Sequence, residues 1–446
     1  MRRRTFVQSI AFGTALSPAP SGAGLKPKRS PGPIPLAADG FVTVFESPDP
    51  WNFRAYSPGL ALLPGGRLVA TLDVGGPGLR DKQGPESYRG RIFTSDDRGQ
   101  TWIHRANVPM YHARPFAAGN AVYVLGHSGD LGIVKSNDNG ETWSETSWLT
   151  EGERWHQAPC NVHYANGRIY LVMEKNTDTS LRGWEVSVLA PVVMAADVSA
   201  DLTSRVAWTF SNALSYRDAL EEAGPAHLIG VPFYTPGPTV PPDNEDRRYM
   251  APPGWLETNV VQFVDPDHLW HDPEGRTFHL WMRAHTGSTN LAAIAKAVES
   301  EDKSSITVSL EKAPSGALML FVPCPGGQMK FHILYDEQTK LFWLLSSQAT
   351  DSMTRPDRLD GDRYNLPNNE RHRLVVHFSK NCVDWCFAAR VADSGAYKQA
   401  RHYASMVIDG DDLHILSRSG DERAKSAHDG NLITFHTVRH FRDLVY

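Results

Sequence analysis

The sequence predicts an all-β protein, a β-propeller of six blades, and three observations indicate this class. Residues 95–102 and residues 136–143, which begin 41 positions later, both read S-x-D-x-G-x-T-W. Short strand-like runs precede each copy, so the Asp-x-Gly element is predicted to be a hairpin turn. The chain contains 36 Gly and 31 Pro, a composition typical of short strands joined by turns. A strand-rich repeat of about 40 residues matches the spacing of propeller blades.

The two octapeptides are predicted to serve structure rather than chemistry. Asp97 and Asp138 are expected to accept hydrogen bonds from the amides of their own turns, while the glycine takes a positive φ. Trp102 and Trp143 are expected to fold back over the hairpins. The pair resembles the Asp-box repeat of the sialidase (BNR-repeat) superfamily, whose boxes lie on the outer rim of a propeller. The resemblance therefore implies a propeller of the sialidase type.

The first 35 residues are predicted to lie outside the folded domain. Arg3, Arg4 and Phe6 precede a weakly apolar stretch at residues 10–16, and small residues and prolines follow. This order is typical of a twin-arginine signal peptide. We therefore expect residues 1–35 to be a signal peptide and linker, and residues 36–446 to be a single propeller domain. The protein is expected to be exported, to the periplasm or beyond.

The remaining strand-like runs can be grouped in order into six blades. The last blade shows three strands, and residues 41–45 are expected to add the fourth and close the ring. Residues 211–254 are Pro-rich and charged, so we expect a short helix at 216–223 and then a long loop. A seventh blade hidden there is the alternative. The runs lie at residues 56–63 and 67–71; 121–125 and 131–135; 168–173, 192–196 and 206–210; 259–263 and 277–282; 329–334, 341–345 and 373–379; and 403–408, 412–417 and 431–437.

The composition limits the classes of molecule that the protein is expected to bind. The 446 residues are 41% hydrophobic and 21% charged, with a formal net charge of −5, which argues against nucleic acid as a main partner. No segment after the N-terminal stretch approaches the ~18 consecutive apolar residues that a membrane span needs. We therefore expect a monomer with no membrane span.

The four cysteines carry a weaker signal. Cys382 and Cys386 are expected to flank a turn and could pair with each other in an oxidising compartment, as Cys160 and Cys324 could also be oxidised. The sequence has no CxxC pair and no His-x-His cluster, so we expect no zinc site and no other metal.

A propeller brings one end of every inner strand to a shared mouth. Polar and charged residues at these openings are not what an apolar core needs, because their burial costs free energy. We therefore expect a funnel that binds anions and holds acid–base groups. The predicted openings carry Arg54 and Tyr56; His112 and Arg114; His156 and Gln157; Glu257 and Asn259; Gln328, Lys330 and His332; and Arg401, His402 and Tyr403.

The resemblance to sialidases implies roles for several of these residues. Glu257 opens a run of the form E-x-x-V-V, like the family's Glu that activates the nucleophile, and Arg283 follows it like a substrate-binding Arg. Tyr403 opens a late strand and matches the nucleophilic Tyr, while Asp81 lies in the loop where the family places its acid. The Arg of the family's Arg-Ile-Pro segment is absent, because the matching stretch reads Tyr-Ser-Pro, with Arg54 two residues before it.

These residues predict an exported glycoside hydrolase that acts on a glycan, one with acidic sugars. Tyr403 is the expected nucleophile and Glu257 its base, because a Tyr hydroxyl with a pKa near 10 is weak until a carboxylate takes its proton. This chemistry requires no cofactor. The residues expected to bind the substrate are Arg283, Lys330, Arg54 and His156, together with Arg418 and His428, which flank or belong to the polar loop at residues 419–431.

Two other functions remain open at this point. One is a polysaccharide lyase that cleaves uronate-containing glycans by β-elimination with His and Tyr as base and acid. The residues available for it are His112, His127, His156, His163 and Tyr403, with Arg283 and Lys330 to neutralise the carboxylate. The other is a non-catalytic glycan-binding propeller. A Glu257 carboxylate within about 3 Å of the Tyr403 hydroxyl favours hydrolysis, whereas a His there favours elimination.

Overall fold

A computed structural model describes residues 35–181, 184–224, 253–352, 354, 358–359, 368–396 and 398–446. Residues Leu36–Tyr446 form one compact unit. The expected signal peptide lies outside the described residues, as does most of the expected insertion loop.

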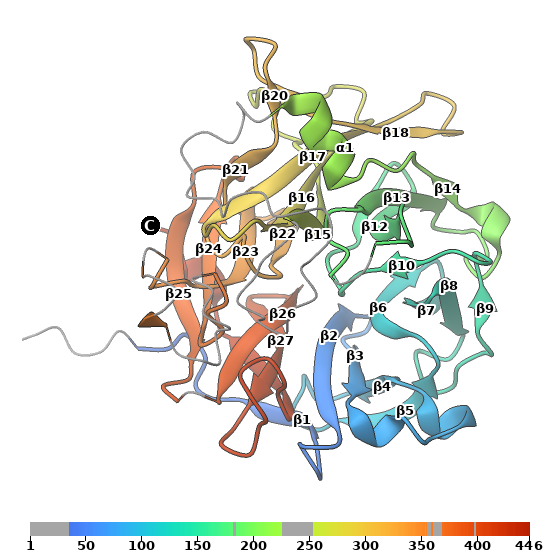
Figure 1. Ribbon diagram of the computed structural model, residues 1–446, viewed down its shortest axis with the longest axis vertical. Helices are drawn as coiled ribbons and strands as arrows, with labels where there is room; N and C mark the ends of the chain where they lie inside the picture. The colour runs from blue at the N-terminus through green and yellow to red at the C-terminus, as the bar shows by residue number, and fades with distance from the viewer. Residues whose placement is uncertain are drawn as a thin grey trace, which may run out of the picture. The chain divides into compact units, whose positions relative to one another are not determined.

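Six antiparallel sheets form the blades, each with its first strand innermost, as in the predicted six-bladed propeller. In Figure 1 the labels of these first strands lie around the middle of the unit. Blades one to three contain β2 (Arg54–Leu62), β3 (Leu68–Gly75), β4 (Gly90–Ser95) and β5 (Ile103–Val108); β6 (Tyr111–Ala118), β7 (Ala121–Ser128), β8 (Asp130–Ser136) and β9 (Ser147–Trp148); and β10 (Trp155–His156), β11 (His163–Ala165), β12 (Arg168–Asn176), β13 (Leu189–Asp197) and β14 (Thr209–Phe210).

The other three blades follow the same plan. They contain β15 (Gly254–Val261), β16 (Thr277–His285), β17 (Leu291–Glu299), β18 (Ile306–Ser309) and β21 (Phe321–Pro323); β22 (His332–Asp336), β23 (Leu341–Ser347), β24 (Arg373–Ser379) and β25 (Cys386–Asp393); and β26 (Ala400–Asp409), β27 (Asp412–Gly420) and β28 (Leu432–Val438) with β1 (Val42–Glu46). A small hairpin, β19 (Glu311–Lys312) and β20 (Leu318–Met319), extends from blade four.

The N-terminal strand closes the ring, as predicted. β1 pairs antiparallel with β28, so the last blade gains its fourth strand from the opposite end of the chain. The alternative of seven blades is wrong for the described residues, which form six. Closure by the two ends of the unit protects the edge between the first and last blades.

Apolar side chains fill the spaces between neighbouring blades. One cluster joins Phe116 and Leu131 of blade two to Met173 and Met194 of blade three. Because a blade has neighbours on both faces, its middle strands are apolar on both sides, and all eight residues of β3 are buried. Asp73 is the only charged residue in this strand and is therefore unusual at its position.

The helix expected at residues 216–223 is present as α1 (Tyr216–Ala223). The side chain of Ser215 caps it by accepting a hydrogen bond from the amide of Asp218, and Tyr216 packs edge-on against Trp255 at 5.4 Å. The strand expected at 206–210 is mostly wrong, because a 3-10 turn occupies Arg205–Ala207 and only Thr209–Phe210 pairs with β13.

The two repeated octapeptides form turns with the same hydrogen bonds, as predicted. Asp97 accepts hydrogen bonds from the Ser95 hydroxyl at 2.8 Å, the Thr101 amide at 2.8 Å and the Thr101 hydroxyl at 2.6 Å. Asp138 accepts the equivalent three, at 2.7, 2.9 and 2.5 Å. Ser95 pairs with Leu68 at the start of β3, which is the end of the blade opposite Arg54.

All four cysteines are free thiols, three of them buried, so the possible pair Cys382–Cys386 is not formed. Across the parts of the chain that the structure describes, no helix has the length and apolar character that crossing a membrane requires.

Candidate functional site

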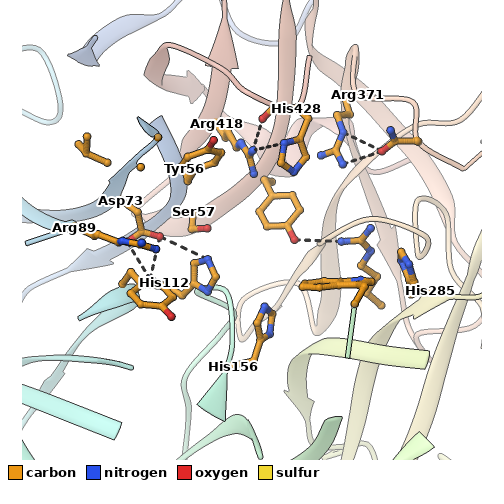
Figure 2. A pocket seen from close by; sticks show the side chains of 18 of the residues that line it. Tyr56, Ser57, Asp73, Arg89, His112, His156, His285, Arg371, Arg418 and His428 are labelled. Carbon is orange, nitrogen blue, oxygen red and sulfur yellow. Dashed lines mark hydrogen bonds and ion pairs between the residues drawn. The ribbon is translucent and has the colours of Figure 1, made fainter. Parts of the chain in front are cut away.

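A cavity of about 510 Å³ opens where the innermost strands begin (Figure 2). The first residues of these strands meet there with the last residues of the strands beside them, because neighbouring strands are antiparallel. The cavity is lined by Tyr56, Ser57, Asp73, Val74, Gly75, Gly76, Arg89, Tyr111, His112, His156, Trp184, Arg283, His285, Asn368, Asn369, Arg371, Tyr403, Arg418 and His428.

Four innermost strands carry the same backbone irregularity at this end. Ser57, His112, Glu257 and Tyr403 have φ of 44°, 54°, 62° and 57°, each at a register shift in its strand. A positive φ is uncommon for residues with a Cβ, and such strain persists where the surrounding structure maintains it, often at functional sites. The repetition in four blades marks this ring of bulges as a built feature of the cavity.

Tyr403, Glu257 and Arg283 form a hydrogen-bonded cluster in the wall of the cavity. The Tyr403 hydroxyl donates to Oε1 of Glu257. Nη1 of Arg283 donates to the same hydroxyl oxygen at 3.1 Å and lies 3.4 Å from Oε2 of Glu257. The carbonyl of Gln328 holds the guanidinium by accepting from its Nε at 2.8 Å. Strands β15, β16 and β26 thus bring together three residues that are far apart in the sequence.

The surroundings of Glu257 favour proton uptake. Its side chain is fully buried, and burial raises the pKa of its carboxyl, with Arg283 opposing the shift. A carboxylate whose pKa is raised, hydrogen-bonded to a phenol, is a competent base for that phenol.

The buried Asp73 and the half-buried His112 form a second group at the other side of the cavity. Both carboxyl oxygens of Asp73 lie 2.9 Å from the amide nitrogen of His112. Burial raises the pKa of Asp73 to about 8, so the group is protonated at neutral pH. Burial, together with nearby His127 and His156, lowers the pKa of His112 well below its ordinary value. Nδ1 of His112 lies 3.2 Å from Nε2 of His127.

Arginines give the cavity a positive potential. Arg89, Arg371 and Arg418 are labelled around it in Figure 2, and Arg283 also lines it. Arg418 lies over the ring of Tyr56 at 4.3 Å and that of Tyr403 at 5.4 Å. Burial lowers the pKa of Arg418 to about 10, so it stays charged at neutral pH. Guanidinium groups are suited to carboxylates and sulfates.

The structure brings most of the expected site residues together. Tyr403, Arg283, His156, Arg418 and His428 line the cavity. Glu257 lies behind Tyr403 and bonds to it.

Three expected residues lie elsewhere. Lys330 is buried, and its Nζ donates to the carbonyl of Ala404 at 2.6 Å and the hydroxyl of Ser405 at 3.1 Å, so it ties blade five to blade six rather than lining the cavity. Arg54 pairs with Asp429 at 3.2 Å and lines a neighbouring cavity. Asp81 is exposed beyond the 3-10 turn Pro77–Leu79 and lines neither cavity. Asp81 follows a turn in a loop, and local sequence pattern does not set where a loop residue lies. This explains why Asp81 is away from the cavity.

Several lining residues were not among the expected site residues, and Asp73, Arg89, Trp184 and Arg371 are four of them. Only Asp73 had a signal in the sequence, as the sole charged residue in the run LVATLDVG. Among the described residues, no group of three or more His, Cys, Asp or Glu side chains is arranged to hold a metal ion.

Comparisons with solved structures show similarity along most of the chain. The Hadza microbial sialidase Hz136 matches 90% of this chain and 68% of its own, with 15% identity and a TM-score of 0.52. The intramolecular trans-sialidase from Ruminococcus gnavus matches 92% of this chain and 99% of its own, with 12% identity and a TM-score of 0.50. No family model matches the sequence, and no curated protein does. The structure and these likenesses show that the chain has the six-bladed β-propeller fold that these two proteins share.

Proposed function

We propose that the protein is a glycoside hydrolase that acts on a glycan with acidic groups, with Tyr403 as the nucleophile and Glu257 as its base. The observation that carries this proposal is the hydrogen bond from the Tyr403 hydroxyl to Glu257, with Arg283 at 3.1 Å from the same oxygen. The comparison with two structures described as a sialidase and a trans-sialidase supports the same reaction class.

The reaction proceeds in two displacements. The Tyr403 oxygen attacks the anomeric carbon while its proton passes to Glu257, and the bond from that carbon to the leaving oxygen breaks. Arg283 stabilises the phenolate character that develops on Tyr403. Water then attacks the glycosyl–tyrosine bond and releases the sugar, and Glu257 returns the proton to Tyr403.

Asp73 is the acid that this site offers for the leaving oxygen. It lines the cavity, and burial raises its pKa to about 8, so it is protonated at neutral pH. A protonated carboxyl at neutral pH can donate its proton to the departing oxygen and take one back from the attacking water. We propose this role for Asp73 in place of Asp81, which lies in the solvent.

Two features support an anionic sugar as the substrate. Arg371 and Arg418 also bond within the protein, to Asn369 and to His428, but both line the cavity, and their positive charge attracts a carboxylate or sulfate. Trp184 is 43% exposed at the cavity and meets the ring of His156 edge-on at 5.6 Å, so its face is available to a sugar ring.

Elimination is the second candidate, because His112 lines the same cavity and is neutral, as a base must be. A glycan panel of sialosides, uronosides and acidic polysaccharides separates the two reactions. We expect new reducing ends without the ultraviolet absorbance of an unsaturated uronate. If that absorbance appears with every new reducing end, the proposal of hydrolysis is wrong and the reaction is elimination.

Matched variants test the nucleophile. Tyr403→Phe removes the attacking oxygen and should lower kcat by about 100-fold or more, and Glu257→Gln should behave similarly. Tyr335→Phe, in β22 and away from this cavity, is the control and should keep full turnover. Full turnover by Tyr403→Phe would rule out the proposed nucleophile.

We also propose that residues 1–35 direct export and that the domain acts as a monomer. Replacing Arg3 and Arg4 by Lys should retain the protein in the cytoplasm on cell fractionation, and light scattering should give the mass of a single chain.

A further inference from the structure

We propose that the substrate is a polyanionic glycan, with a second acidic group bound in a basic annex beside the catalytic cavity. This inference rests on the proposed function for the reaction but on a separate cavity for the binding. We define the annex as the cavity of about 790 Å³ lined by Arg54, Gly76, Pro77, Leu79, Arg80, Ser87, Arg89, Lys425, His428 and Asp429.

The annex and the catalytic cavity are contiguous. Gly76, Arg89 and His428 line both of them. Figure 2 shows Arg89 beside Asp73 and His428 beside Arg418 at the edge of the catalytic cavity. Each cavity falls in the range of about 300–1,000 Å³ that takes a whole small ligand, so the two together have room for more than one sugar.

The annex has an excess of positive charge. Its lining includes four cationic side chains, Arg54, Arg80, Arg89 and Lys425, and one carboxylate, Asp429. Burial lowers the pKa of His428 to about 3, so this residue is neutral at pH 7.

Asp429 is already neutralised by its neighbours. It forms an ion pair with Arg54 at 3.2 Å, lies 3.6 Å from Nζ of Lys425, and accepts a hydrogen bond from the Tyr56 hydroxyl at 2.9 Å. Burial raises the pKa of Asp429, but the hydrogen bonds from His428 and Tyr56 and the charge of Arg54 outweigh it and leave the pKa well below its usual value. The charge of Asp429 is therefore neutralised within the protein and does not neutralise Arg80 or Arg89, whose charges can attract a ligand.

The acidic residues nearest in sequence to Arg80 do not reduce this charge. Asp81 and Glu86 lie outside the lining, and Glu86 pairs with Lys82 at 3.2 Å. Arg80, Arg89 and Lys425 are exposed, so a ligand reaches them without moving other side chains. Exposed cations around a hollow attract carboxylates or sulfates and fix them by paired hydrogen bonds.

The test measures binding and not turnover. Isothermal titration calorimetry is done on Tyr403→Phe protein, which holds the glycan uncleaved, with three hexasaccharides. Hexagalacturonate carries carboxylates only, a heparin hexasaccharide carries sulfates as well, and methyl-esterified hexagalacturonate is the neutral counterpart. The double variant Arg80→Ser/Lys425→Ser removes two annex charges. Lys312→Ser/Lys380→Ser removes two exposed charges that line neither cavity and is the matched control.

We expect the annex variant to bind at least one anionic hexasaccharide about three- to tenfold more weakly at low salt, as expected for two exposed charges. The difference should shrink at high salt, and the control should bind like the parent. The hexasaccharide whose affinity falls in the annex variant shows whether the annex prefers carboxylates or sulfates. Equal affinities of parent and annex variant, or no binding of either anionic hexasaccharide, would overturn the annex. Loss of binding in the annex variant without any glycan hydrolysis by the wild type would instead overturn only the proposed reaction.

Discussion

Asp73 should make the stability of this protein fall as pH rises from 5 to 8. In the folded protein burial raises the pKa of this carboxyl to about 8, whereas in the unfolded chain it titrates near its ordinary value of 3.8. Between these two values the folded state holds a proton that the unfolded state releases. The free energy of unfolding must then decrease with pH, since the folded state binds more protons. Asp73→Asn, a permanently neutral counterpart, removes this dependence.

The size of the effect follows from one proton. A difference of one bound proton changes the free energy of unfolding by at most about 1.4 kcal/mol per pH unit. Between pH 5 and pH 7 the wild type should therefore lose up to ~3 kcal/mol relative to Asp73→Asn. The backbone amide of His112 can still donate to the remaining oxygen of Asn, so the variant should fold.

The assay is equilibrium urea unfolding at pH 5, 6, 7 and 8 for wild type and variant. Asp336→Asn is the matched control, because Asp336 is also buried but has its pKa lowered by the ion pair and hydrogen bonds it forms with Arg442 and Thr339, against the effect of burial. Stability from a lowered pKa is fully present above the unfolded value of 3.8, so this control should differ from wild type by the same amount at every pH tested. Parallel wild-type and Asp73→Asn curves would refute the protonated Asp73 and, with it, the proposed acid.

Three further predictions concern a residue of the cavity, a turn residue and a buried lysine. Trp184→Ala should raise KM about tenfold with little change in kcat, since it removes a stacking face but no reacting group, whereas Trp148→Ala on the exposed outer strand should change neither; an unchanged KM would remove Trp184 from the site. Asp138→Ala should lower Tm by a few degrees through loss of three turn hydrogen bonds and leave kcat unchanged, and a fall in kcat at full folding would contradict its structural role. Lys330→Met should destabilise the fold by about 1–3 kcal/mol in urea unfolding, because it leaves the buried Ala404 carbonyl unpaired, and a raised KM with unchanged stability would restore Lys330 to substrate binding.

The fold was open to sequence reasoning because propeller blades repeat local signals. The spacing of the two octapeptide turns indicated the length of one blade. A strand-like run near the N-terminus belonged to no blade, and only blade six lacked a fourth strand, so the two could be matched. Strand alternation and turn chemistry act over a few residues, so they are readable without knowing distant contacts. The helix at residues 216–223 was predicted from a stretch without strand alternation, and α1 confirms it.

The site was only partly readable. Glu257 and Tyr403 were predicted at strand openings, and Arg283 was named through the resemblance to sialidases. The fold joins Tyr403 to Glu257 across 146 positions of sequence. Lys330 was misplaced because a side chain near a strand start can face the cavity or the interior, and a one-residue shift exchanges the two. The bulges with positive φ near the starts of four innermost strands change which side chains face the cavity, and no local sequence pattern predicts these bulges.

The sequence by itself predicted six blades, their order along the chain and the kinds of residue that reach one mouth, with a seventh blade as the alternative. Only the tertiary structure decided which residues meet: Asp73 instead of Asp81 at the cavity, and Arg371 and Trp184 in the same cavity as Tyr403. Blade geometry arises from hydrogen bonds and turns between residues close in the chain. Convergence at the mouth depends on packing between blades and on bulges that turn side chains, and those interactions join residues hundreds of positions apart.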